Sequence, residues 1–105
     1  MLKINSYTTK SGKNLFNKWF KELGREDKER LTKRLERIKE TGNFGDCKHL
    51  SDGVFELKFH FDAGYRIYFG KDGKRVIILL CGGDKDSQNQ DIKKAINLWQ
   101  EYQKN

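Results

Sequence analysis

The chain has 105 residues, of which 35% are hydrophobic, 35% are charged and 12% are aromatic. A chain of this length is expected to form one domain over residues 1–105, and its aromatic content separates it from disordered chains that cannot offset the entropy of ordering. The formal net charge is +7, from 22 lysines and arginines against 15 acidic residues. This balance favours an anionic partner such as nucleic acid, the ribosome or an acidic protein.

The cysteine content and the apolar runs restrict where the protein works. Two cysteines, Cys47 and Cys81, are too few to predict a disulfide framework, and a reducing cytoplasm is the expected location. Lys3 and Asn5 interrupt the N-terminal apolar residues, and no stretch approaches the roughly 18 apolar residues that a membrane span requires. The sequence therefore predicts neither an exported nor a membrane-inserted protein.

The first half of the chain predicts one short strand and two helices. Residues 4–8 are weakly patterned and predict an edge strand. Apolar residues recur at three- and four-residue spacing over residues 15–23, which predicts a helix that ends near Gly24. A narrower apolar stripe with many basic residues predicts a second helix over residues 25–41, stopped by Gly42. The short loop between them predicts an antiparallel helical hairpin that lies on a sheet.

The second half predicts more strands and a final helix. Residues 47–50 fit a short strand, and Asp72-Gly73 marks a turn before residues 76–81, an apolar run that does not alternate. Such a strand is usually covered on both faces, so it is expected at the centre of the sheet. A capping-box pattern that begins at Ser87 precedes an apolar helical stripe. The expected fold is a compact α+β domain of order β-α-α-β-β-β-α, with a curved antiparallel or mixed sheet.

Residues 55–66 predict a β-hairpin with two different faces. Strict alternation places apolar side chains on one face of its first strand and polar ones on the other, because successive strand residues point to opposite sides. A turn at residues 62–64, with Gly64 at the position that needs positive φ, would pair Phe61 with Tyr65. This register decides which polar side chains meet on the second face.

The polar face of this hairpin is the strongest candidate for a functional site. The register places His60 opposite Arg66 and Lys58 opposite Tyr68. An ordinary solvated sheet face has a similar composition, so that interpretation stays open. If the face is an active site, the chemistry that fits is metal-free RNA cleavage, in which Lys58 or His60 moves protons and Arg66 holds the phosphate. Tyr68 would stack on a base or donate a hydrogen bond, and a required 2′-hydroxyl would make the substrate RNA.

Asp84 and Lys85 extend this candidate site. Both residues follow the apolar strand at residues 76–81, which is expected to lie beside the hairpin. The loop at the end of that strand would then bring their side chains within reach of Arg66. The candidate catalytic set is therefore Lys58, His60, Arg66, Asp84 and Lys85.

Three weaker patterns have simpler explanations. Cys47 and His49 have the spacing of a metal clip, but a structural zinc site needs four ligands. Gly82-Gly83 precedes a helix without the spacing of a phosphate-binding loop, so turn geometry explains the pair equally well. Basic side chains of the second helix either contact RNA phosphates or form a solvated face with Glu–Lys pairs. The RNA-contact candidates on this helix are Arg34, Arg37 and Lys39.

Four segments carry a family resemblance: Asn43-Phe44-Gly45-Asp46, Glu56-Leu57-Lys58, Gly64-Tyr65-Arg66-Ile67-Tyr68-Phe69 and Leu80-Cys81-Gly82-Gly83-Asp84-Lys85. Together with the order of elements, they resemble the RelE/ParE toxin superfamily, and more narrowly its HigB-like addiction-module killer branch. The resemblance covers nearly the full chain. It implies a bacterial type II toxin that cleaves mRNA on the ribosome without a cofactor and is silenced by a cognate antitoxin.

The resemblance also implies roles for individual residues. Arg66 matches the phosphate-stabilising arginine of the family, and Lys58 matches a basic residue on the preceding strand. His60 lies where related toxins often carry another basic residue, and Lys85 where a late catalytic or RNA-contacting side chain is expected. Tyr102 lies on an apolar helical stripe and does not match the C-terminal catalytic tyrosine of better-known relatives, so the general base stays open. Two alternatives are a ParE-like inhibitor of DNA gyrase and an RNA- or ribosome-binding module without catalysis.

Overall fold

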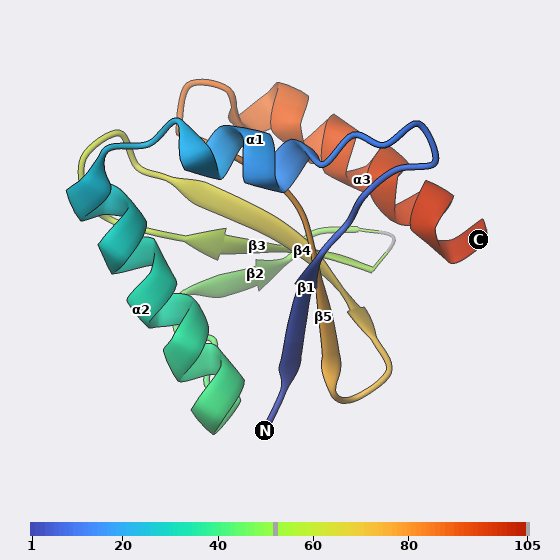
Figure 1. Ribbon diagram of the computed structural model, residues 1–105, viewed down its shortest axis with the longest axis horizontal. Coiled ribbons are helices and arrows are strands. Elements are labelled where there is room, and N and C mark those ends of the chain that lie inside the picture. Colours follow the sequence, from blue (N-terminus) through green and yellow to red (C-terminus); the bar gives the residue numbers. More distant parts are fainter. Residues whose placement is uncertain (52, 105) are drawn as a thin grey trace.

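The computed structural model describes residues 1–51 and 53–104, which form three helices and a five-stranded sheet (Figure 1). The predicted α+β class is confirmed, and the segment near residues 47–50 adds a fifth strand to the predicted order. In chain order the elements are β1 (Lys3–Ser6), α1 (Leu15–Lys21), α2 (Arg25–Thr41), β2 (Cys47–His49), β3 (Val54–Lys58), β4 (Arg66–Asp72), β5 (Val76–Gly83) and α3 (Gln88–Lys104).

The sheet is mixed, with the strand order β1-β5-β4-β3-β2. Strand β1 runs parallel to β5 at one edge, and the other neighbouring strands are antiparallel. Strand β5 lies inside the sheet and is buried along most of its length, as its unbroken apolar run predicts. The middle position belongs to β4, which therefore has a neighbour on each side and a helical layer on each face.

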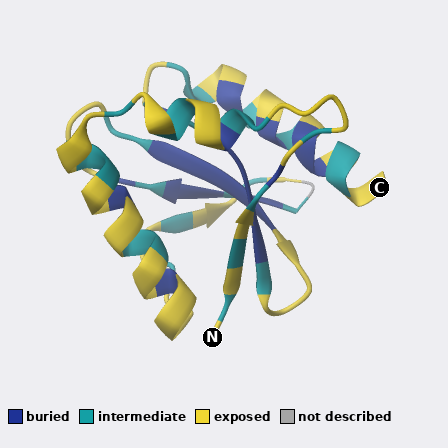
Figure 2. Cartoon of the chain, viewed as in Figure 1, coloured by how far each residue is buried: buried dark blue, intermediate teal, exposed yellow. Residues whose placement is uncertain are grey.

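Two apolar clusters fill the space between the sheet and the helices. One joins α1 and α2 to the sheet through Phe16, Leu31 and Ile38, and the other joins α3 through Ala95 and Trp99. Figure 2 shows the inner strands buried and the outward sides of the helices exposed. No helix in the described ranges is long and apolar enough to span a membrane. Because both faces of the sheet are covered, the polar face of the hairpin is not open to solvent along its length.

The helix ends differ from prediction at one glycine. Helix α1 ends at Lys21, and Gly24 is the N-cap of α2 with an extended backbone (φ −64°, ψ 156°), not the C-cap of α1. Helix α2 has the predicted bounds and stops at Gly42, whose φ of 73° is left-handed. The two helices share one face of the sheet but diverge at a wide angle instead of packing antiparallel (Figure 1), because each lays its own apolar stripe on the strands.

The Gly82-Gly83 pair lets two helices approach β5 closely. A Cβ at Gly82 would overlap the indole of Trp19 on α1, and a Cβ at Gly83 would overlap the carboxylate of Asp91 on α3. Asp91 is buried and accepts a hydrogen bond from the hydroxyl of Ser87. This bond accounts for a serine ahead of α3 and does not require the predicted capping box. Close packing, and not phosphate binding, accounts for the two glycines.

Candidate functional site

Strands β3 and β4 form the predicted hairpin in a register that differs by two residues. Lys58 pairs with Arg66, and Glu56 pairs with Tyr68. The predicted register, in which His60 lies opposite Arg66 and Lys58 opposite Tyr68, is therefore wrong. The difference is an even number of residues, so the same side chains still share one face.

The hairpin loop is wider than predicted because its aromatic residues are held by α2. The Phe59 N–H donates to the Tyr65 carbonyl (3.0 Å), which closes the loop. The Tyr65 hydroxyl donates to the carboxylate of Asp27 (2.7 Å), and the Arg30 guanidinium lies 3.7 Å from the centre of the Phe61 ring. The hydrogen bond to Asp27 raises the pKa of Tyr65 to about 12. These contacts with α2 favour a longer loop over the tight turn that the local residues suggest.

The polar face of the hairpin is largely buried under α3. The exposed fractions of Glu56, Arg66 and Tyr68 are 1%, 8% and 0%. The Tyr68 hydroxyl donates to Glu56 (3.1 Å), and burial raises the pKa of that hydroxyl above its ordinary value. This structure therefore does not support the predicted contact of Tyr68 with RNA, because its ring has no exposed surface on which a base could stack.

Arg66 is fixed at the start of β4, where the buried face meets the loop. Its Nη1 donates to the carbonyls of Gly64 (2.7 Å) and Tyr65 (3.3 Å), and its Nε lies 3.9 Å from Oε2 of Glu56. A guanidinium tied to backbone carbonyls loses little additional freedom when it binds an anion. Arg66 thus has the preorganisation that charge stabilisation in a reaction requires.

A shallow cavity of about 440 Å³ brings three of the predicted site residues together. Its lining includes His60 from the hairpin loop, Arg66 from β4 and Lys85 from the loop before α3. The Lys85 N–H donates to the Ala63 carbonyl (3.3 Å), which joins the two loops. Lys85 is exposed, so this cavity combines a held cation with a freely accessible one.

Two other predicted residues lie beside the cavity and not in its wall. The Lys58 side chain is 28% exposed, and its ammonium lies 4.0 Å from Oε1 of Glu56. The Asp84 carboxylate accepts hydrogen bonds from the N–H groups of Asp86 (2.9 Å) and Ser87 (3.1 Å). Asp84 therefore orders the loop ahead of α3, and its carboxylate is already engaged by backbone donors.

His60 is exposed but has a carboxylate partner. Its Nε2 contacts Oδ2 of Asp46, which belongs to the connector ahead of β2. The hydrogen bond from His60 lowers the pKa of Asp46 below the usual aspartate value. This contact orients the imidazole at the rim of the cavity.

Arg34, one of the predicted RNA contacts, joins α2 to the sheet through its guanidinium. Its guanidinium donates to the carbonyls of Phe44 and Asp46 (both 3.0 Å) and of Lys58. Burial of the side chain lowers the pKa of Arg34. Arg37 and Lys39 are exposed on α2, and their predicted contact with RNA stays a prediction.

Burial affects both cysteine thiols in the same direction. Burial raises the pKa of the Cys81 thiol to about 12, and burial also raises the pKa of the half-buried Cys47. Among residues 1–51 and 53–104, no group of three or more His, Cys, Asp or Glu side chains is placed to hold a metal ion.

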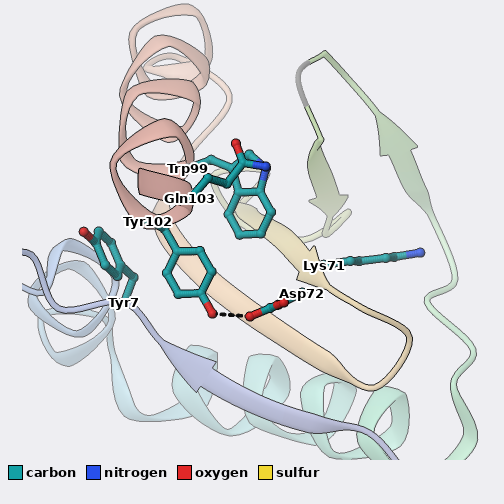
Figure 3. A pocket seen from close by; sticks show the side chains of 6 residues that line it. All are labelled: Tyr7, Lys71, Asp72, Trp99, Tyr102 and Gln103. Carbon is teal, nitrogen blue, oxygen red and sulfur yellow. Dashed lines mark hydrogen bonds between the residues drawn. The ribbon is translucent and has the colours of Figure 1, made fainter. Parts of the chain in front are cut away.

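A second hollow, of about 560 Å³, lies at the other end of the sheet and contains Tyr102 (Figure 3). The Tyr102 hydroxyl donates to Asp72, and its ring stacks on Trp99 with a centroid distance of 5.1 Å. Arg66 and Asp72 begin and end the seven-residue β4, so they are separated by about 20 Å. Tyr102 is therefore too far away to take part in chemistry at Arg66.

Sequence reasoning missed the acidic and amide groups under the site. Glu56 was assigned to the polar face without a role, yet its carboxylate contacts four side chains, including that of Gln88 (2.7 Å) at the start of α3. The available signal was the apolar strand β5, because a sheet covered on both faces also covers the polar face of its hairpin.

The fold of this chain is similar to that of two solved RelE structures. The chain aligns with the isolated E. coli RelE toxin at a TM-score of 0.60 and 16% identity, over 90% of this chain and 98% of that one. A chain of the intact E. coli RelBE toxin-antitoxin complex matches at a TM-score of 0.61 and 17% identity, over 80% and 96%. These likenesses establish the fold that the sequence resemblance predicts.

Sequence comparison places the protein in a particular family. Residues 18–102 match the family model of the phage-derived Gp49-like protein (DUF891), so the chain belongs to the Gp49-like family. An uncharacterized protein of Haemophilus influenzae is 42% identical over 87 residues, which are 82% of this chain and 87% of that protein.

Proposed function

We propose that this protein is the toxin of a type II toxin–antitoxin pair and a metal-independent endoribonuclease that cleaves mRNA on the ribosome. The observation that carries the proposal is the Arg66 guanidinium, which backbone carbonyls hold beside a cavity that also presents His60 and Lys85. The net charge of +7 adds long-range attraction to RNA.

The proposed reaction needs a charge stabiliser, a base and an acid. The ribose 2′-hydroxyl attacks the adjacent phosphorus and loses its proton to a base, while an acid returns a proton to the departing 5′-oxygen. A 2′,3′-cyclic phosphate and a 5′-hydroxyl result. Arg66 stabilises the negative charge that develops on the phosphate oxygens. The candidates for proton transfer are Lys58, His60 and Lys85, and exposed Arg37 and Lys39 on α2 are the candidates for backbone contacts.

An antitoxin is the proposed protein partner. The RelE-like fold matches a chain of a complex that contains a toxin and its antitoxin. A cognate antitoxin would cover or distort the basic cavity, and the pair would work in the bacterial cytoplasm. Toxin that stays fully active when saturated with its antitoxin would contradict this part of the proposal.

The test is to map mRNA 5′ ends after brief expression of the wild type, Arg66→Ala and Arg75→Ala. Arg75 is exposed in the turn before β5, so it is a matched control for the loss of one arginine. Arg66→Ala should lower cleavage about a hundredfold, because it removes transition-state charge stabilisation. If Arg66→Ala cleaves mRNA as fast as the wild type, Arg66 has no part in the mechanism. DNA breaks with intact mRNA would support gyrase inhibition instead, and salt-sensitive RNA binding without a cut product would support a binding module.

A further inference from the structure

Glu56 is a fully buried carboxylate in a basic protein. It lies on β3 with 1% of its surface exposed. A buried carboxylate is strongly destabilising unless it is paired and hydrogen-bonded. A carboxylate at this position therefore calls for partners that stabilise its negative charge.

Both oxygens of this carboxylate have cationic neighbours. Oε1 lies 4.0 Å from the Lys58 ammonium, and Oε2 lies 3.9 Å from Nε of Arg66. Lys58 and Arg66 are direct cross-strand partners, and like charges in that arrangement repel each other. Glu56 lies between the two cations and offsets their repulsion at the point where the cavity begins.

Two neutral groups fix the direction of the carboxylate. Oε2 accepts hydrogen bonds from the Tyr68 hydroxyl (3.1 Å) and from the side-chain amide of Gln88 (2.7 Å). Tyr68 belongs to β4, and Gln88 is the first residue of α3. The carboxylate is thereby held from a neighbouring strand and from the helix that covers this face.

We infer that Glu56 is a positioning residue, which holds the Arg66 guanidinium and the Lys58 ammonium in the geometry that grips a phosphate. This inference rests on the proposed function. Nη1 of Arg66 donates to loop carbonyls, Nε lies 3.9 Å from Oε2 of Glu56 without forming a hydrogen bond, and Nη2 forms no hydrogen bond among the described residues. The guanidinium of Arg66 is thus oriented so that Nη2 can donate a hydrogen bond to an incoming phosphate oxygen. Glu56 itself does not move a proton, because its buried carboxylate cannot reach substrate.

The main test compares Glu56→Gln with Arg66→Ala and with the double variant. Glutamine keeps the shape and an acceptor oxygen but removes the charge. Glu56→Gln should lower kcat about 10- to 100-fold with little change in KM, because a misplaced catalytic group costs about that much. In the Arg66→Ala background the same change should alter cleavage less than about twofold, because groups that act as a unit are not additive. Glu29 is an exposed glutamate of α2, so Glu29→Gln is the control for the loss of one negative charge and should cleave as the wild type does.

A spectroscopic measurement makes the inference independent of nuclease activity. The Nε–Hε resonance of Arg66 in a ¹⁵N–¹H correlation spectrum should shift in Glu56→Gln and stay unchanged in Glu29→Gln. If Glu56→Gln does not fold, Gln88→Ala serves instead, because it removes one hydrogen bond from the carboxylate at the edge of the core. It should shift the same resonance and lower kcat about three- to tenfold.

Two results would overturn the positioning role. One is an Arg66 Nε–Hε resonance that is the same in the wild type and in the folded variant. The other is a rate loss in the double variant equal to the product of the two single losses, since Glu56 would then act apart from Arg66. A wild-type protein that cleaves no RNA would refute the proposed function instead, and the resonance would still decide whether Glu56 positions Arg66.

Discussion

The close packing of Gly82 against Trp19 predicts a large effect for Gly82→Ala. A Cβ at Gly82 would lie 2.6 Å from Cδ2 of Trp19 and closer still to two other atoms of the indole. The indole cannot move aside freely, because it also contacts the rings of Phe16 and Tyr65, each at a centroid distance of 5.9 Å. Either the ring or the strand must therefore shift.

The magnitude follows from the cost of overpacking. Extra methyl groups in a well-packed core destabilise a protein by about 1–3 kcal/mol. In a domain of this size each kcal/mol lowers the melting temperature by about 4–8 °C. Gly82→Ala should therefore melt roughly 5–20 °C below the wild type when unfolding is followed by circular dichroism.

Gly24→Ala is the matched control for this substitution. Gly24 has φ −64°, and a Cβ there would meet no atom within 4 Å, so the variant should melt close to the wild type. In a Trp19→Leu background the smaller side chain leaves room, and Gly82→Ala should cost less than in the wild type. Equal melting temperatures for Gly82→Ala and Gly24→Ala would refute the packing explanation. So would a loss of stability in the Trp19→Leu/Gly82→Ala double variant that equals the sum of the two single losses.

Three further predictions concern titration, thiol chemistry and the distant tyrosine. The hydrogen bond from His60 lowers the pKa of Asp46, so its stabilising effect is present above about pH 4 and is lost as the pH falls through the folded-state pKa. Acid unfolding curves of the wild type and Asp46→Asn should thus converge at low pH. The pKa of Cys81, raised by burial to about 12, predicts that iodoacetamide at pH 8 modifies Cys47 first, which peptide mass spectrometry would show. Tyr102→Phe should leave RNA cleavage within about twofold of the wild type, because its hydroxyl contacts Asp72, which lies about 20 Å along β4 from Arg66.

Local sequence patterns were sufficient to predict a helix or strand where the signals for its type and its ends lie within the element itself. The bounds of α2 follow from its apolar stripe and from Gly42, and β5 follows from an apolar run too short for a helix. Gly24 was misassigned because a glycine between two helices can cap either one. Its extended backbone selects the start of α2, and only the packing of both helices on the sheet determines that conformation.

The hairpin register could not be read from the turn residues, because residues distant in sequence decide it. Asp27 and Arg30 on α2 hold Tyr65 and Phe61, and these contacts outweigh the local preference for a tight turn. The prediction of which side chains share a face of the hairpin was still correct, because the observed register differs from the predicted one by two residues, an even number. The same reasoning applies to Arg34, which looks like part of a solvated helix face but donates to carbonyls 10 to 24 residues away.

The polar side chains of the hairpin thus divide by depth into two groups with different physical roles. At the end of β4 nearest the loop, Arg66 borders the cavity and can meet a phosphate, together with His60 and Lys85. One pair deeper, Glu56 and Tyr68 are buried and can act only on their neighbours. Alternation along a strand assigns residues to a face but does not say where along that face the covering helix begins. The first turn of α3 sets that limit, because Gln88 contacts Glu56, and it therefore separates the side chains that border the cavity from those that are buried beneath it.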